Sequence, residues 1–419
     1  MAVGTKLVSM AVAVLSVPIL LRLLGVQDYG TWVTLTSLIA FISLLDLGVG
    51  NNLRNAVASA TDTAELARAR DEFVGFFQLL IVVSLCALLL FAVSVAFSSL
   101  LQGNLSASIL LYGPLLLMLP TMLGASVLQG YRATGLQAMI QASSSWMFFL
   151  LTAAFAWAGR SVTLPQLSIG WSVFYSATAA LVFGIALRVL RLPLSRLTQW
   201  RLSSLPKERL RIGLEFLALQ LSSLVLYGLG NALIYHSLGA DEVARYDVLN
   251  KIFQVALSFF TIIIGVMWTE IARHRAHKNR DALWRIYRRL WLASVASSLA
   301  FVGGALAAPW IIDHWTHHRL QVSSGEALAV ALLACIQSMA YAGAVFMNAF
   351  ERIRLQVMLA GVSIVLMIPL SLLLMRLGAG IAAVPLAAAA LTLLPALACN
   401  GIAVSLIRSV PAGAGHRVD

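Results

Sequence analysis

The sequence predicts an all-α integral membrane protein with about twelve transmembrane helices in two lobes of six. Apolar residues make up 60% of the 419 positions and charged residues only 11%, whereas soluble proteins carry about 25% charged residues. Apolar runs of about 20 residues, the length that one helical crossing requires, recur along the whole chain. The two halves of the chain also share a repeated pattern. A soluble α/β or all-β domain would instead need polar helix faces or alternating strands.

The expected crossings follow from the positions of the apolar runs, with ends placed to within a few residues. They are 5–24, 29–50, 73–99, 107–129, 138–158, 163–187, 212–236, 246–269, 290–311, 326–349, 355–375 and 379–406. No small-residue cleavage site follows the first run, so it is interpreted as a retained helix and not as a signal peptide.

The basic residues predict the orientation of these helices. With the N-terminus inside, 23 of the 29 Lys and Arg residues fall in the inner gaps, and six fall outside: Arg22, Arg160, Arg245, Lys251, Arg319 and Arg376. Positive residues accumulate on the cytoplasmic side, so both termini are expected there. The net charge of +12 is thereby explained as a topology signal, and nucleic acid is not an expected partner.

Motifs for catalysis or cofactor binding are missing from the sequence. Cys86, Cys335 and Cys399 each lie in an apolar run without a metal-binding spacing, so they are expected to pack as small hydrophobic residues. No phosphate-binding loop or dinucleotide fingerprint occurs, so no cofactor is expected and ATP is not the direct energy source. The longest outer loop, 312–325, is too short to hold an enzymatic domain.

A repeat at an offset of about 214 residues relates the two halves. Each half has a Leu-Gly pair followed by an aspartate and a tyrosine: Leu24, Gly25, Asp28 and Tyr29, then Leu238, Gly239, Asp241 and Tyr246. Six helices separate the copies, so the copies point the same way across the membrane. Such parallel repeats are related by a pseudo-twofold axis along the membrane normal, which is a transporter plan.

The predicted lobes are 1–187 and 212–419, joined by a basic segment, 188–211, on the cytoplasmic side. Arginines alternate with leucines in this segment, as at Arg191, Arg196 and Arg201. One interpretation places the segment on the inner membrane surface with its arginines on anionic lipids. The alternative is a solvated linker whose charges only set the topology.

The segment 20–54 resembles the opening of the bacterial polysaccharide flippases, which translocate O-antigen and exopolysaccharide repeat units and belong to the multidrug/oligosaccharidyl-lipid/polysaccharide exporter superfamily. The family pattern is Arg-x-Leu-Gly, then Tyr-Gly, then Asp-Leu-Gly, matched here by Arg22, Leu24, Gly25, Tyr29, Gly30, Asp46, Leu47 and Gly48. More diffuse likeness covers Leu238-Gly239, Tyr246, the basic 273–289 segment and 348–376. One departure is that Thr269 and Glu270 follow Trp268, where the family often has a proline.

The resemblance implies a fold like the multidrug-and-toxin-extrusion transporters and the peptidoglycan lipid-precursor flippase. It implies translocation of a polyprenyl-pyrophosphate-linked oligosaccharide from the inner to the outer leaflet of the bacterial inner membrane. The expected partners are this lipid-linked glycan, membrane lipids and a polysaccharide polymerase complex.

Charged residues in or near the spans are the candidate substrate site, because a charge inside a bilayer is costly and is a functional candidate by default. The candidate pyrophosphate contacts are Arg22, Arg54, Lys251 and Arg273. The structural alternatives are snorkelling for Arg22, a surface ion pair with Asp247 for Lys251, and topology anchors for Arg54 and Arg273.

Carboxylates and amides complete the candidate set. Asp46 and Glu215 are candidates for coupling to a H⁺ or Na⁺ gradient, although a helix-end packing role for Asp46 and an Arg211 ion pair for Glu215 are favoured. Continuous helix would place Arg54 on the same face as Asp46. Asn231, Gln254 and Asn348 are candidate glycan contacts, or else hydrogen-bond donors between helices.

Two other functions compete with the flippase. A cation-coupled small-molecule exporter of the same fold would want an acidic residue deep in the first helix, and 5–24 contains none. A membrane glycan polymerase or glycosyltransferase is disfavoured by the half-chain repeat and by the short loops.

Overall fold

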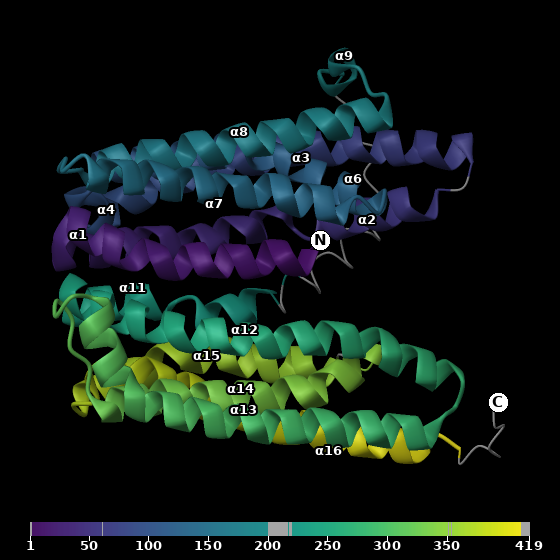
Figure 1. Ribbon diagram of the computed structural model, residues 1–419. Coiled ribbons are helices and arrows are strands. Elements are labelled where there is room, and N and C mark those ends of the chain that lie inside the picture. The colour runs from purple at the N-terminus through teal and green to yellow at the C-terminus, as the bar shows by residue number, and fades with distance from the viewer. Residues whose placement is uncertain are drawn as a thin grey trace. The chain divides into compact units, whose positions relative to one another are not determined.

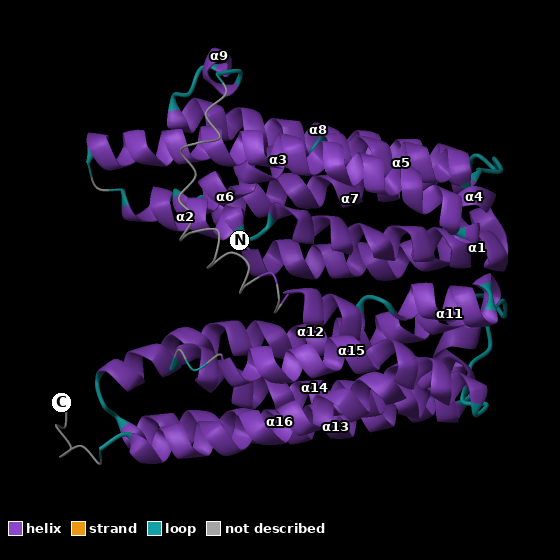
Figure 2. Ribbon diagram, turned by 180° about the vertical axis from the view of Figure 1, so that it is seen from behind, coloured by secondary structure: helices purple, strands orange, loops and turns teal. Residues whose placement is uncertain are grey.

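The computed structural model describes residues 2–60, 62–199, 217, 220–350, 352 and 354–411. All of the regular secondary structure in these residues is helical (Figure 2). The chain divides into two compact units, Met1–Leu221 and Ser222–Asp419. The expected all-α membrane architecture is therefore confirmed, and each unit is described by itself below.

Unit 1 begins with a helical hairpin that is folded at a glycine. The element α1 (Ala2–Ile42) consists of two arms that meet at Gly25, whose φ of 77° and ψ of 179° are not helical, and the arms lie side by side (Figure 1). This backbone region is essentially restricted to glycine. The prediction of two crossings separated near residue 25 is thus correct.

The second arm is broken where the sequence predicted one helix over 29–50. It ends in η1 (Ser43–Asp46), and Leu47 and Gly48 adopt left-handed φ values of 51° and 72° before α2 (Val49–Ser59) begins. The Leu-Gly pair supplies the glycine that such a turn favours. The prediction of one helix over 29–50 is therefore wrong at its inner end, and the helical continuity that would place Arg54 on the face of Asp46 does not occur.

The remaining helices of unit 1 pack beside this hairpin. They are α3 (Thr63–Phe97), α4 (Ser99–Gly103), α5 (Leu105–Leu117), η2 (Leu119–Met122), α6 (Leu123–Gly130), α7 (Thr134–Trp157), α8 (Leu164–Leu190) and α9 (Leu194–Leu197). Asp62 caps α3 by accepting from the amide of Glu65, and a Thr163–Gln166 capping box starts α8. Both satisfy amides that a helix start leaves unpaired.

One expected crossing, 107–129, is bent by 54° between α5 and η2. Pro120 explains the bend, because its ring has no amide hydrogen and clashes with the carbonyl four residues earlier, that of Leu116. The hydroxyl of Ser84 donates to this freed carbonyl at 2.6 Å. The broken backbone is thereby satisfied at membrane depth, as a bilayer requires.

The start of the predicted linker docks on unit 1. Leu192 and Leu197 are buried in a core with Phe73 and Leu190, and the amide of Gln78 donates to the carbonyls of Leu197 and Gln199 at 3.3 and 2.5 Å. The rest of the linker, including Arg201, lies outside the described residues.

Unit 2 repeats the opening hairpin. Residues 222–227 are helical, and α11 (Gly230–Leu238) is followed at Gly239, with φ 99° and ψ 174°, by α12 (Ala240–Ala276). The later helices are α13 (Arg280–Trp315), α14 (Ser324–Ala349), α15 (Arg354–Arg376), η4 (Gly380–Ala382) and α16 (Ala383–Ser409). Asn279 caps α13, and a Ser323–Glu326 capping box starts α14.

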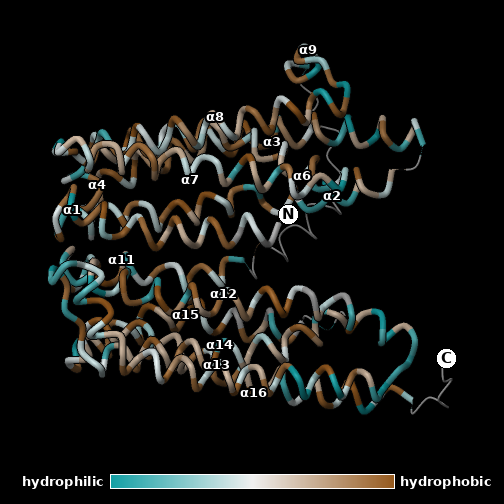
Figure 3. The backbone as a smooth tube through the Cα atoms, viewed as in Figure 1, coloured by the Kyte–Doolittle hydropathy of each residue, from teal (hydrophilic) through white to brown (hydrophobic). Residues whose placement is uncertain are grey.

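The described helices identify a multi-pass membrane protein. Eight of them are long and apolar enough to span a bilayer, and the bent α5–α6 pair makes a ninth. A shorter apolar helix, Gly361–Arg376, lies within α15. Large apolar side chains face outward, with Leu89 67% and Leu299 71% exposed, as lipid-facing positions do. Hydrophilic residues gather at helix junctions such as α12–α13 (Figure 3).

Candidate functional site

The two candidate cations of unit 1 are exposed. Arg22 lies in α1 just before the Gly25 fold, and Arg54 lies in α2. Within the described part of the chain, neither side chain has a hydrogen bond or an ion pair. A β-carbon on Gly130 would come within 2.9 Å of the Arg54 carbonyl, so α6 packs directly against the backbone that carries Arg54.

In unit 2 the structure brings three polar residues together. Asp247 of α12 is buried, with 9% of its surface exposed, and Asn231 of α11 is 8% exposed. The Asn231 amide donates to Oδ1 of Asp247 at 3.4 Å, and the Lys251 ammonium donates to Oδ2. The spacing of four residues in a helix predicts the Lys251–Asp247 pair, whereas nothing in the sequence indicates that Asn231 joins them.

The position of Lys251 in its hairpin differs from that of Arg22. Lys251 lies six residues beyond Arg245 in α12, which is about 9 Å along a helix axis. Lys251 also follows Gly239 by twelve residues, whereas Arg22 precedes Gly25 by three. The two cations therefore occupy different arms of their hairpins, and the repeat places His236, not Lys251, at the position of Arg22.

The remaining candidates lie apart from this cluster. Arg273 is exposed in the last turn of α12, Gln254 is half-buried farther along the same helix, and Asn348 is half-buried near the end of α14. No partner of these three side chains occurs among the described residues. Glu215 lies outside the described residues.

Asp46 takes part in the helix break of unit 1. Its Oδ1 accepts from the amide of Gly48 at 2.7 Å, and the amide of Gly50 also donates to it. A β-carbon on Gly50 would lie 3.0 Å from Oδ2 of Asp46 and 2.7 Å from the Ser126 hydroxyl. The carboxylate thus pairs the first amides of α2, as negative groups at helix starts do.

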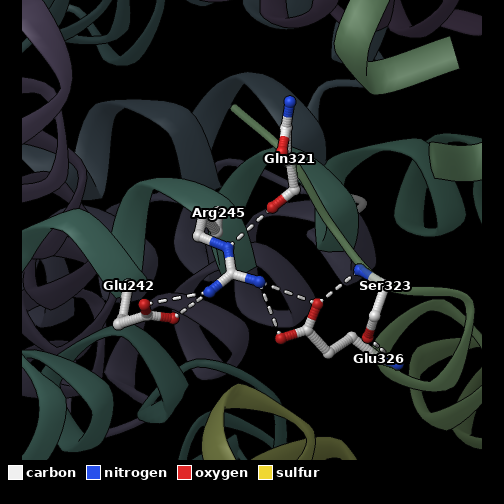
Figure 4. Close-up of polar contacts among 5 residues, drawn as sticks. All are labelled: Glu242, Arg245, Gln321, Ser323 and Glu326. Carbon is white, nitrogen blue, oxygen red and sulfur yellow. Dashed lines mark hydrogen bonds and ion pairs between the residues drawn. The ribbon is translucent and has the colours of Figure 1, made fainter. Parts of the chain in front are cut away.

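Arg245 organises a polar network at the start of α12 that the sequence did not reveal (Figure 4). Its guanidinium donates to both carboxylate oxygens of Glu242 at 2.7 and 2.9 Å and to both of Glu326 at 2.9 and 3.0 Å. Its Nε donates to the Gln321 carbonyl at 2.8 Å. Paired donors of this kind are a property of arginine that lysine lacks, so Arg245 fixes α12 to the loop before α14.

Comparison with known sequences gives no assignment. No family model matches the chain, and no curated protein matches it.

Comparison with solved structures defines the fold. An inward-facing multidrug resistance MATE family transporter of the MOP superfamily superposes with a TM-score of 0.71 at 15% identity, covering 96% of each chain. The lipid II flippase MurJ in an inward closed conformation superposes with a TM-score of 0.73 at 11% identity, covering 96% of this chain and 87% of MurJ.

A third similar structure is a MOP superfamily transporter from Pyrococcus furiosus that is described as having a binding pocket of reversed polarity. Its TM-score is 0.61 at 13% identity, with 98% of this chain and 96% of that chain covered. These three neighbours are transporters or flippases. The chain therefore has the fold of MOP-superfamily transporters over nearly its whole length.

Proposed function

We propose that the protein is a flippase that moves a polyprenyl-pyrophosphate-linked oligosaccharide, such as an O-antigen or exopolysaccharide repeat unit, from the inner to the outer leaflet of a bacterial inner membrane. Both termini would lie in the cytoplasm. Transport would follow alternating access, in which two repeats rock about a site near the midplane. A polysaccharide polymerase complex would receive the product.

The observation that carries this proposal is a first pass that contains cations and no acidic residue, in a fold shared with a lipid II flippase. Arg22 lies unpaired among the described residues, and no acidic residue occurs before Asp28. An anionic diphosphate requires such cations, and guanidinium and ammonium groups are its ordinary ligands. A cationic drug would require the opposite charge.

The membrane potential would supply the driving force. Outward movement of one negative charge gains about 2.3 kcal/mol per 100 mV when the cytoplasm is negative. A doubly charged pyrophosphate headgroup would gain about twice that amount. A H⁺ or Na⁺ gradient is then not required, and Arg22, Arg54, Lys251 and Arg273 would serve to offset the desolvation of the phosphates.

A deletion strain tests the class of function. We expect it to accumulate lipid-linked oligosaccharide on the cytoplasmic side and to lose surface glycan. Loss of the lipid-linked oligosaccharide itself would instead indicate an enzyme that synthesises it. Replacing Arg22 by alanine should lower surface glycan in complemented cells, whereas Arg160→Ala, at an exposed arginine outside the candidate set, should not.

The Lys251–Asp247 pair allows a sharper test of substrate contact. Lys251→Ala removes the cation beside the buried carboxylate of Asp247, and removing one partner of a buried ion pair can cost about 3 kcal/mol, so loss of transport in this single variant is ambiguous. The double variant Asp247→Asn/Lys251→Gln removes both charges of this ion pair together. If Lys251 binds the diphosphate, the double variant stays folded but transports poorly; full transport would reduce Lys251 to a structural role.

A second function has one observation in its favour. The buried carboxylate of Asp247 is a group that a cation-coupled drug exporter could protonate, and the fold is shared with MATE transporters. Overexpression in a drug-sensitive strain distinguishes this function: raised resistance that is abolished by Asp247→Asn would support export of small molecules.

A further inference from the structure

Unit 1 contains a cavity beside the bent pass between α5 and α6. Its volume is about 390 Å³, and it lies between η2, α6, α7 and α8, within the 300–1,000 Å³ typical of small-molecule sites. At Gly124 a β-carbon would lie 2.7 Å from Cα of Phe183, so only glycine lets α6 approach α8 this closely. The bend at Pro120 then leaves space against α7 next to this contact.

Hydrogen-bonding groups without charge line the cavity. They include the side chains of Thr121, Gln141, Ser145, Trp171, Tyr175 and Thr178. Gln141 accepts from Gln137 through its Oε1, which leaves its amide hydrogens available. Among the described residues, Ser145, the Trp171 indole and the Tyr175 hydroxyl also have no hydrogen-bond partner. None of the described lining residues carries a charge.

The aromatic pair in the cavity forms a flat platform. The rings of Trp171 and Tyr175, one turn apart on α8, stack with centroids 5.1 Å apart and planes only 10° apart. Both residues are half-buried, so ring surface remains open to a ligand. Flat aromatic surface next to neutral donors and acceptors is suited to a sugar ring, which has apolar C–H faces and a polar rim.

The polar face of α7 indicates that the cavity is wet. Gln141 and Ser145 are exposed in the middle of a helix that is apolar enough to span a bilayer. Polar side chains at such depth face protein partners or a water-filled path and avoid lipid. Broken helices at membrane depth also commonly line binding cavities in transporters.

We propose that this cavity binds a neutral sugar residue of the transported glycan, with the Trp171–Tyr175 platform against the sugar face and Gln141 and Ser145 bonded to its hydroxyls. This inference rests on the proposed function and adds a recognition site for the glycan that is separate from the cations assigned to the diphosphate. The absence of charge among the described lining residues makes the cavity unsuited to phosphate or to a cationic drug.

Cysteine protection tests the site in the full-length protein. The Ser145→Cys variant is made after the native cysteines are replaced by alanine, and it is labelled with a charged, water-soluble thiosulfonate. The probe ligand is the free oligosaccharide released by mild acid from the lipid-linked fraction of the host. At ten times its dissociation constant this glycan should slow labelling about tenfold, because it occupies about nine-tenths of the sites.

The controls separate this proposal from the proposed function. Ala154→Cys, exposed on the same helix but outside the cavity, should not be protected, and polyprenyl pyrophosphate without glycan should not protect Ser145→Cys.

Transport of lipid-linked oligosaccharide without glycan protection would overturn the cavity proposal alone. Protection without transport would support the cavity and overturn the flippase. Lack of labelling would show a dry cavity and overturn the proposal.

Aromatic substitution provides an independent readout. Trp171→Leu removes the platform and should raise the apparent KM for glycan-bearing lipid about three- to tenfold, with kcat little changed. Trp171→Phe keeps an aromatic face and should restore most of the affinity. Equal kinetics for both variants and the wild type would contradict a sugar platform.

Discussion

The two glycine-folded hairpins share a backbone and differ in their chemistry. Gly25 and Gly239 adopt nearly the same conformation, with φ of 77° and 99° and ψ of 179° and 174°. The second arm in unit 1 is interrupted between Asp46 and Val49, whereas α12 in unit 2 continues unbroken to Ala276. Unit 2 instead carries the Arg245 network and the Lys251–Asp247–Asn231 cluster.

This difference shows what the internal repeat preserves. A fold between two antiparallel arms requires a backbone conformation that only glycine adopts readily, so the glycine and its spacing recur. Side chains on the arms are free to diverge, because the arms are held by packing. Chemistry assigned to one hairpin therefore cannot be transferred to the other by sequence offset, as Arg22 and Lys251 illustrate.

The largest expected stability effect comes from the feature that the hairpins share. Gly25→Ala and Gly239→Ala should each destabilise the protein by about 1–3 kcal/mol, since no neighbouring atom lies within 4 Å of an added β-carbon and the cost is backbone strain alone. Thermal unfolding in detergent would show a lowered Tm for both variants.

Gly303→Ala is the matched control. This glycine lies within α13, also with open space around it, and alanine is favoured over glycine in a helix by about 1 kcal/mol. An unchanged or raised Tm is expected. If the Gly25→Ala or Gly239→Ala variant has the same Tm as this control, the glycine conformation proposed for both hairpins is contradicted.

An effect of intermediate size should occur only in unit 2. Arg245→Lys keeps the charge but loses the two paired carboxylate contacts, which should cost about 1–2 kcal/mol. The lowered Tm should be accompanied by faster hydrogen exchange at the start of α14. Arg160→Lys, at an exposed arginine without a partner in the described residues, should leave both measurements unchanged; equal behaviour of the two variants would contradict the network.

The smallest effect concerns the break that only unit 1 contains. Asp46→Ala should lower stability by about 1 kcal/mol, because the first amides of α2 lose their acceptor. Asp46→Asn retains an acceptor and cannot ionise, so it should keep both the wild-type Tm and transport. A normal Tm with abolished transport in the asparagine variant would assign Asp46 to ion coupling instead.

Much of the fold was predictable because hydrophobic runs and basic gaps set the passes directly. The sequence also located the Leu-Gly fold of both hairpins. It did not predict the bend of the fourth pass, although Pro120 was a visible signal, because prolines occur within other helices here, such as Pro309 and Pro369. The break after Asp46 was not predicted either, because Leu47 and Gly48, which form it, lie inside the expected helix 29–50.

The site was less predictable because it depends on distant contacts. The pairing of Lys251 with Asp247 followed from helical spacing, but the approach of Asn231 required the hairpin to fold. Arg245 was assigned only to the outer side, because its partner Glu326 lies 81 residues away. The stacking of Trp171 on Tyr175 beside a cavity likewise depends on contacts between helices that the sequence does not show.

Translocation in proteoliposomes tests the central claim most directly. Purified protein is reconstituted with lipid-linked oligosaccharide from the deletion strain, a 100 mV potential is imposed with the donor side negative, and glycan reaching the opposite face is measured by a membrane-impermeant glycosidase. We predict protein-dependent translocation that slows when the potential is removed. Accumulation at the rate of protein-free liposomes, in protein shown to be folded, would contradict the proposed flippase.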